Sequence, residues 1–186
     1  MENLAGMRKF PFWIMVAFLV LFSPVAQAAD EYYSIPAAAA KNDIDGVARL
    51  LVDGKSPNDV DSDGRTGLIY AAMFGNAPMA QYLIQHGADA RTRDGLGYTA
   101  LHWAAQQGSI GVIGVLINAG LPVDVTTKEG ITPLMMAADH NQLAVIHKLL
   151  DNGADPKRQD FSGRDAEGWA IGKPAALKIL QGTASH

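Results

Sequence analysis

The 186-residue sequence contains no cysteine and no run of basic residues. The first absence excludes disulfide bonds, thiolate metal sites, cysteine nucleophiles and lipid attachment through an N-terminal cysteine. A chain without thiols also passes safely into an oxidising compartment. The second absence, together with a formal net charge of -4, argues against nucleic acid and against an anionic membrane surface as the partner.

Sequence signatures of common enzymes are also absent. The chain contains no G-x-S-x-G, no H-E-x-x-H, no phosphate-binding loop and no dinucleotide fingerprint. Its hydrophobic content of 48% is nevertheless enough for a packed core. We therefore expect a folded protein that is not an enzyme and that needs no cofactor and no metal ion.

The first 28 residues have the order of a secretory signal peptide. Arg8 and Lys9 precede the apolar segment 10–22, which is shorter than the roughly 20 residues needed to span a bilayer. Small residues then occupy positions 26 and 28, as signal peptidase requires. The pattern predicts cleavage after Ala28, export to the periplasm and no stable membrane association afterwards. An uncleaved anchor is the alternative, and the signal is also compatible with a eukaryotic secretory route.

A period of 33 residues organises the rest of the chain. One set of glycines with this spacing consists of Gly64, Gly97, Gly130 and Gly163, and another of Gly54, Gly87, Gly120 and Gly153. Apolar residues keep the same period, in columns such as Leu50, Leu83, Leu116 and Leu149. Within each repeat the apolar positions are spaced i, i+3 and i+4, which is one stripe of a helix.

Each repeat is expected to contain two helices. Alanine pairs at 71–72, 104–105 and 137–138 allow these helices to approach closely. The first helix should begin after a threonine, whose hydroxyl can accept a free backbone N–H, and should end at a residue that tolerates a left-handed backbone. The expected starts are Thr66, Thr99 and Thr132, and the expected ends are Gly75, Gly108 and Asn141.

Two segments point to a known family. Residues 98–105, YTALHWAA, resemble the signature of the ankyrin repeat, and residues 131–138, ITPLMMAA, resemble a variant of it. The resemblance covers about residues 33–181 and implies an all-α fold, an ankyrin-repeat solenoid of stacked helix pairs with hairpin-like connectors. Gly67 and Ala100 replace the family's usual proline, and Ile69 and Met135 replace the histidine that His102 retains.

The register also divides the chain into repeats. Terminal repeats of a solenoid have only one neighbour and act as caps. Helix pairs are expected at 34–41 with 44–53 in the first cap, and at 165–171 with 174–181 in the last. The expected divisions are 1–28 (signal peptide), 29–62 (N-terminal capping repeat), 63–95, 96–128 and 129–161 (full repeats), and 162–186 (truncated C-terminal capping repeat).

The resemblance implies where a partner binds. In ankyrin proteins the ends of the first helices and the connector tips line a concave groove that holds partners. Large side chains exposed where the core makes no demand on them indicate such contact. The expected contact residues are Met73, Phe74, Tyr98, Gln106, Gln107, Ile131, Asp139 and His140.

Other conspicuous residues are interpreted as structural. In the family, the histidine equivalent to His102 ties neighbouring repeats together by hydrogen bonds, so we expect that role here. Asp139 and His140 are adjacent on a helix and point about 100° apart, so they do not form a ready acid–base pair. A column of large side chains is interpreted as framework packing between first helices: Tyr70, Trp103, Met136 and Trp169.

Three aspartates raise the question of calcium. Asp59, Asp61, Asp63 and Gly64 match the opening of a calcium-binding loop, but Tyr70 occupies the twelfth position, where the loop needs a bidentate glutamate. Aspartate and glycine are also ordinary turn formers in a connector. The sequence leaves calcium binding open and favours the turn.

Taken together, these features predict a monomeric periplasmic protein that binds a protein partner through its concave groove without catalysis. Neutralising a toxin, assisting a stress-defence enzyme and acting as an envelope scaffold are all compatible with the sequence. One alternative is a small-molecule- or metal-dependent enzyme with a site assembled across repeats, for which a pocket of converging histidine and carboxylate groups would argue. The other is a purely structural array, for which a uniformly polar groove would argue.

Cleavage is directly testable. N-terminal sequencing of the protein recovered from the periplasm should begin at Ala29, because Ala26 and Ala28 place the scissile bond after position 28. An intact Met1 on protein recovered from a membrane pellet would contradict the prediction.

Overall fold

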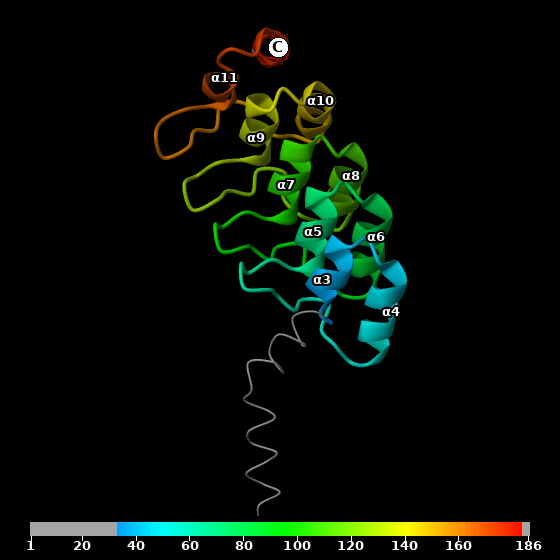
Figure 1. Ribbon diagram of the computed structural model, residues 1–186. Helices are drawn as coiled ribbons and strands as arrows, with labels where there is room; N and C mark the ends of the chain where they lie inside the picture. Colours follow the sequence, from blue (N-terminus) through cyan, green and yellow to red (C-terminus); the bar gives the residue numbers. More distant parts are fainter. Residues whose placement is uncertain (1–32, 184–186) are drawn as a thin grey trace, which may run out of the picture.

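The computed structural model describes residues 33–183 as a stack of five helix pairs (Figure 1). No regular β-strand occurs within this described part, so the expected all-α solenoid is confirmed. The pairs are α3 (Ile35–Ala40) with α4 (Ile44–Val52), α5 (Gly67–Met73) with α6 (Ala77–Gln85), α7 (Ala100–Gln107) with α8 (Ile110–Asn118), α9 (Pro133–Asp139) with α10 (Leu143–Asp151), and α11 (Ala166–Trp169) with α12 (Pro174–Thr183).

The helices form two layers, because the first helices pack on one another along the stack and the second helices follow one another beside them. One layer consists of the first helices α3, α5, α7, α9 and α11 (Figure 1). We call the surface of this layer that points away from the second helices the first-helix face. The second helices α4, α6, α8, α10 and α12 make the other layer. The long connectors between pairs all extend to the same side of the stack, next to the first helices (Figure 1).

The first helices begin and end at the residues that the sequence indicated. The hydroxyl oxygens of Thr66 and Thr132 each accept the backbone N–H three residues further on, at 3.3 Å. At the other end, Gly75, Gly108 and Asn141 have φ angles of 66°, 84° and 53°. This left-handed backbone is unstrained for glycine and tolerated by asparagine, and it turns the chain sharply toward the second helix.

The core lies between the layers and between successive pairs. Leu83, Leu116 and Leu149, in one column of the second helices, are 0% exposed. Leu50 occupies the same column in α4 but is only half-buried, because no helix pair among the described residues covers it. Burial of each pair therefore depends on the pair before it in the stack.

The connectors are hairpin-like, as expected. An isolated antiparallel bridge joins Val60 to Thr66, and another joins Arg93 to Thr99. Neighbouring connectors also contact each other, because the N–H of Gly95 donates to the carbonyl of Asp63 at 2.8 Å. The connectors thus form a hydrogen-bonded row rather than independent loops.

The predicted signal peptide, residues 1–28, lies outside the described residues, and its cleavage stays a prediction. None of the helices between residues 33 and 183 is both long enough and apolar enough to cross a membrane.

The buried column gives a stability prediction. Leu116→Ala should lower the free energy of unfolding by about 2–5 kcal/mol, because it leaves a cavity at a fully buried site. Gln107→Ala, at an exposed position in the same repeat, should change it by less than about 0.5 kcal/mol. Urea denaturation followed by circular dichroism measures both values, and equal effects would contradict the register.

Candidate functional site

One column of predicted contact residues runs along the ends of the first helices. Phe74 is the C-cap of α5, Gln107 is the last residue of α7 and His140 is the C-cap of α9. All three side chains are exposed, and Phe74 is exposed to 62%. Their shared register places them side by side on successive helices, so that one partner surface could touch all three.

The neighbouring column is half-buried rather than fully exposed. It consists of Met73, Gln106 and Asp139, each one residue before a member of the exposed column. The carbonyl of Gln106 accepts a hydrogen bond from Gln142 Nε2 at 2.9 Å. These residues therefore combine a partly open side chain with contacts inside the stack.

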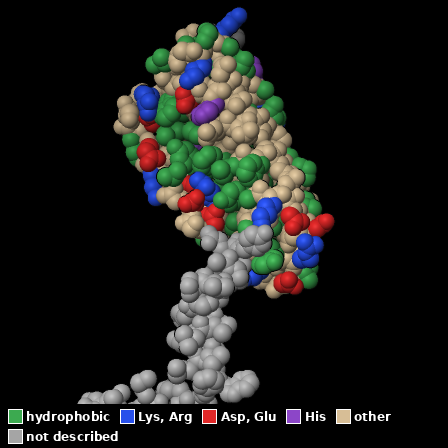
Figure 2. All heavy atoms as spheres, viewed as in Figure 1, with side chains coloured by type: hydrophobic (Ala, Val, Ile, Leu, Met, Phe, Trp, Pro, Cys, Tyr) green, Lys and Arg blue, Asp and Glu red, His purple; other side chains and the backbone are tan. Residues whose placement is uncertain are grey.

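Aromatic side chains gather at the N-terminal half of this face. The rings of Tyr70 and Phe74 are stacked with centroids 6.3 Å apart, and the rings of Tyr98 and Trp103 lie 5.5 Å apart. Arg65 occupies the same repeat position as Tyr98, and its guanidinium carbon lies 5.8 Å from the Trp103 ring centroid. We call Tyr70, Phe74, Tyr98 and Trp103 the aromatic patch, and Figure 2 shows hydrophobic side chains collected over α5, α7 and their connectors.

A cleft adjoins the aromatic patch between two connector tips. Its volume is about 590 Å³, and its walls include Asp61, Arg65, Asp94 and Leu96. Leu96 is exposed to 59%. A partner side chain that reached past the patch would therefore meet an apolar residue at the connector tip and acidic groups beneath it.

Two predicted contact residues are less accessible than expected. Ile131 is only 8% exposed, so its expected exposure at a connector tip is wrong. The connector turn holds Ile131 among the buried core residues, and the Ile131 N–H donates to Thr127 Oγ1 at 3.2 Å. Tyr98 is half-buried, because its ring packs against His102 and Trp103.

The sequence analysis did not predict that aspartates of successive repeats accept hydrogen bonds from the aromatic side chains. We call these aspartates, Asp61, Asp94 and Asp160, the aspartate ladder. Trp103 Nε1 donates to Asp94 at 2.9 Å and Trp169 Nε1 donates to Asp160 at 3.0 Å, while the Tyr70 hydroxyl donates to an aspartate in the same register. The other carboxylate oxygen of Asp94 accepts two backbone N–H groups that close the connector turn. The sequence contained a signal for this contact: Asp61 and Asp94 are 33 residues apart, Asp160 follows two periods after Asp94, and each lies nine residues before an aromatic residue.

Asp61 belongs to this ladder, which bears on the calcium question. Its Oδ1 accepts the N–H groups of Asp63 and Arg65, each at 2.9 Å, and its Oδ2 accepts the Tyr70 hydroxyl at 2.7 Å. Asp63 in turn pairs with Arg65 at 2.9 Å. The structure thus gives these aspartates protein donors, and within residues 33–183 no three His, Asp or Glu side chains gather to hold a metal ion.

His102 links neighbouring repeats. Its Nδ1 accepts the Thr99 N–H at 3.2 Å, so that Nε2 carries the proton and donates to the Ile131 carbonyl at 3.0 Å. Burial lowers the pKa of His102 to about 4, and the bond to Ile131 only partly opposes this shift. His102 is therefore neutral at neutral pH and structural in its contacts.

Asp139 and His140 face different partners. The Asp139 carboxylate pairs with Lys173 at 2.8 Å, whereas His140 Nδ1 lies 3.9 Å from that carboxylate. The same His140 nitrogen lies 3.0 Å from the carbonyl of Met136. This arrangement closes the polar end of the face with a cross-repeat ion pair and does not align the histidine with its neighbouring acid.

Comparison with known families agrees with this geometry. A family model for ankyrin repeats, which spans three copies of the repeat, matches residues 35–127 and again residues 88–160. The two matches overlap and together extend from the beginning of α3 to the last connector.

The buried histidine gives a pH prediction. In the unfolded chain His102 becomes protonated below about pH 6.5, whereas in the folded protein it stays neutral until about pH 4. Between these pH values the unfolded state binds more protons than the folded state, so the free energy of unfolding decreases as the pH falls. From about pH 7.5 to about pH 5 this loss should amount to about 2 kcal/mol.

Urea denaturation at the two pH values measures the effect. His102→Gln retains hydrogen-bonding groups but does not titrate, so the difference between wild type and this variant isolates the histidine from the carboxylates. An identical pH dependence in both proteins would show that His102 does not cause the loss.

Proposed function

Since the chain belongs to the ankyrin repeat family, whose members generally mediate protein–protein interactions, we propose that it binds a protein partner through its first-helix face. The aromatic patch is the observation that carries this proposal. Phe74 is 62% exposed at the C-terminal end of α5, a position that contributes little to packing between the repeats. Aromatic side chains dominate the binding energy of protein interfaces, and an exposed phenylalanine beside half-buried rings is the kind of anchor that a partner covers.

The first-helix face changes from apolar to polar along the stack, which favours a partner whose surface changes in the same way. The aromatic patch lies on α5 and α7, whereas the exposed end of α7 and the end of α9 carry Gln107 and His140. Beyond them Asp139 and Lys173 form their ion pair. We infer that the partner places apolar side chains on the aromatic patch and polar groups toward α9.

Export defines the compartment in which that partner is sought. The basic residues Arg8 and Lys9, the apolar segment 10–22 and the small residues before Ala29 support a periplasmic location. The lack of cysteine supports it as well, because such a chain needs no protection of thiols there. In that location the protein acts by binding, as a toxin-neutralising protein, a stress-defence helper or an envelope scaffold, and it functions as a monomer without catalysis.

The experiment begins with the protein that copurifies with this chain from periplasmic extract. Phe74→Ala should weaken binding of that protein by about 2 kcal/mol, roughly thirtyfold in affinity, because it removes an exposed aromatic anchor. Its thermal midpoint should stay close to that of the wild type, since Phe74 contributes little burial to the stack. Isothermal titration calorimetry and a thermal melt measure the two effects.

Val52 provides a control. It is also an exposed apolar residue, at 87%, but it is the last residue of α4, in the layer of second helices, and belongs to neither the first helices nor the connector tips. Val52→Ala should therefore bind the partner with unchanged affinity. If Phe74→Ala binds as tightly as wild type, or if only Val52→Ala weakens binding, the assigned surface is wrong.

A further inference from the structure

The cleft between the first two connectors lies where the later connectors carry a long side chain. Position 95 is a glycine, and the equivalent positions of the next two connectors are Lys128 and Phe161. A methyl group added to Gly97 would lie 3.0 Å from Lys128 Cγ, so the lysine stem lies against that turn. The Phe161 ring lies against Gly130 in the same way, where the corresponding distance to Cδ1 is 2.9 Å. Each of these side chains therefore covers the turn glycine of the preceding connector.

The turn at Gly64 has only backbone beside it. The three atoms nearest to a methyl group added there are all backbone atoms of Asp94 and Gly95. The N–H of Gly95 donates to the carbonyl of Asp63 at 2.8 Å, which brings the two connectors together without a side chain over the turn. The space left at this position is the cleft of about 590 Å³, which both glycines line. Its counterparts along the stack thus show which occupants fit, namely a long alkyl stem or a ring.

The walls of the cleft favour the alkyl stem with a cation at its end. They carry the carboxylates of Asp61, Asp63 and Asp94 and one guanidinium group, that of Arg65, which gives a formal charge of -2. Asp61 and Asp94 are engaged by the hydrogen bonds of the aspartate ladder, whereas the Asp63 side chain is 61% exposed. Leu96, which is 59% exposed, provides an apolar wall along which an alkyl stem can lie.

Asp63 can accept a further donor. It pairs with Arg65 at 2.9 Å, and a carboxylate has about four acceptor positions, so a second cation can bind without displacing that arginine. Lys128 shows how a lysine is held at the equivalent place, because its Nζ donates to the carbonyl of Gly95 at 3.3 Å. A phenylalanine ring would fill the same space but would desolvate the carboxylate of Asp63 without offering it a donor.

We propose that the protein partner inserts one basic side chain into this cleft, with its stem against Leu96 and its charged group on Asp63. This proposal rests on the proposed function, because it names the chemistry that the partner presents beside the aromatic patch. The partner side chain takes the place that Lys128 takes over the next turn. Asp63 is then the residue that selects a basic side chain over an acidic or an aromatic one.

Isothermal titration calorimetry with the protein that copurifies from periplasmic extract tests the role of Asp63. Asp63→Asn should weaken binding about threefold to tenfold, because it removes the charge that faces the cation. Raising the salt concentration should weaken binding of the wild type more than binding of this variant. The thermal midpoint should stay close to that of the wild type, since the backbone bond to Gly95 remains.

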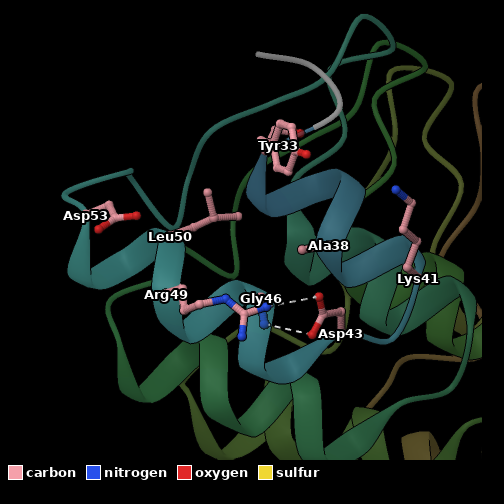
Figure 3. A pocket seen from close by; sticks show the side chains of 9 residues that line it. Tyr33, Ala38, Lys41, Asp43, Gly46, Arg49, Leu50 and Asp53 are labelled. Carbon is pink, nitrogen blue, oxygen red and sulfur yellow. Dashed lines mark hydrogen bonds and ion pairs between the residues drawn. The ribbon is translucent and has the colours of Figure 1, made fainter. Parts of the chain in front are cut away.

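Asp53→Asn is the matched control. Asp53 is also an exposed acidic residue that lines a pocket, but this pocket lies between α3 and α4 at the N-terminal end of the stack (Figure 3). The variant makes the same change in net charge and should leave the affinity and its salt dependence unchanged. An equal effect of Asp53→Asn and Asp63→Asn would overturn the proposal, because net charge alone would then account for it.

Phe74→Ala separates this proposal from the proposed function. If Phe74→Ala weakens binding and Asp63→Asn does not, the assignment of the cleft is wrong and the first-helix face stands. If neither variant weakens binding, the face and the cleft are both wrong.

Three short peptides probe the cleft without the partner. They are acetyl-Leu-Lys-Leu-amide and its versions with glutamate or phenylalanine at the centre. In proton–nitrogen NMR spectra of the protein, purified as the expressing cell processes it, the lysine peptide should shift the amide signals of Gly95 and Leu96, and these shifts should decrease in Asp63→Asn. Equal or larger shifts with either of the other peptides, or no shift with the lysine peptide, would overturn the proposal.

Discussion

A single helix pair of this chain cannot bury its own apolar stripe, and the rest of the structure follows from that constraint. Leu116 is fully buried only because the preceding pair lies against it, whereas Leu50, in the same column at the end of the stack, stays half-open. Stability therefore resides in contacts between neighbours, as it does in other solenoids. Side chains that contact neither neighbouring repeat do not contribute to this packing. A binding surface can arise at these positions without a loss of stability.

The aromatic patch is held in place by groups that also shape the connectors. Asp94 accepts the backbone N–H groups of Leu96 and Tyr98 with one oxygen and the Trp103 indole with the other. One buried carboxylate thus closes the turn and orients the ring that lies against Tyr98. Rings held in this way lose little freedom when a partner arrives, which favours affinity without a change in contact area.

The sequence allowed prediction of those features of the fold that follow from the 33-residue period. The 33-residue spacing and the residues with left-handed backbone located the first helices and their ends, because helix periodicity and positive φ act locally. The exposure of Ile131 was predicted wrongly, because the repeat period does not determine which way the side chain of a connector residue points. The contact between Asp94 and Trp103 was missed because a separation of nine residues across a turn belongs to neither the helix nor the strand period.

The boundary of the aromatic patch follows from a coupled replacement in the repeat that contains α9. There the ladder aspartate is replaced by Thr127 and its aromatic partner by Met136. Thr127 Oγ1 still accepts the N–H groups of Glu129 and Ile131, each at 3.2 Å, so the turn keeps its hydrogen bonds. A buried carboxylate that had lost its indole donor would carry a desolvation cost, and a threonine avoids it. Because the second replacement removes the ring, the aromatic patch ends at α7 and the exposed end of α9 is polar, although the column has an aromatic residue again at Trp169 in α11.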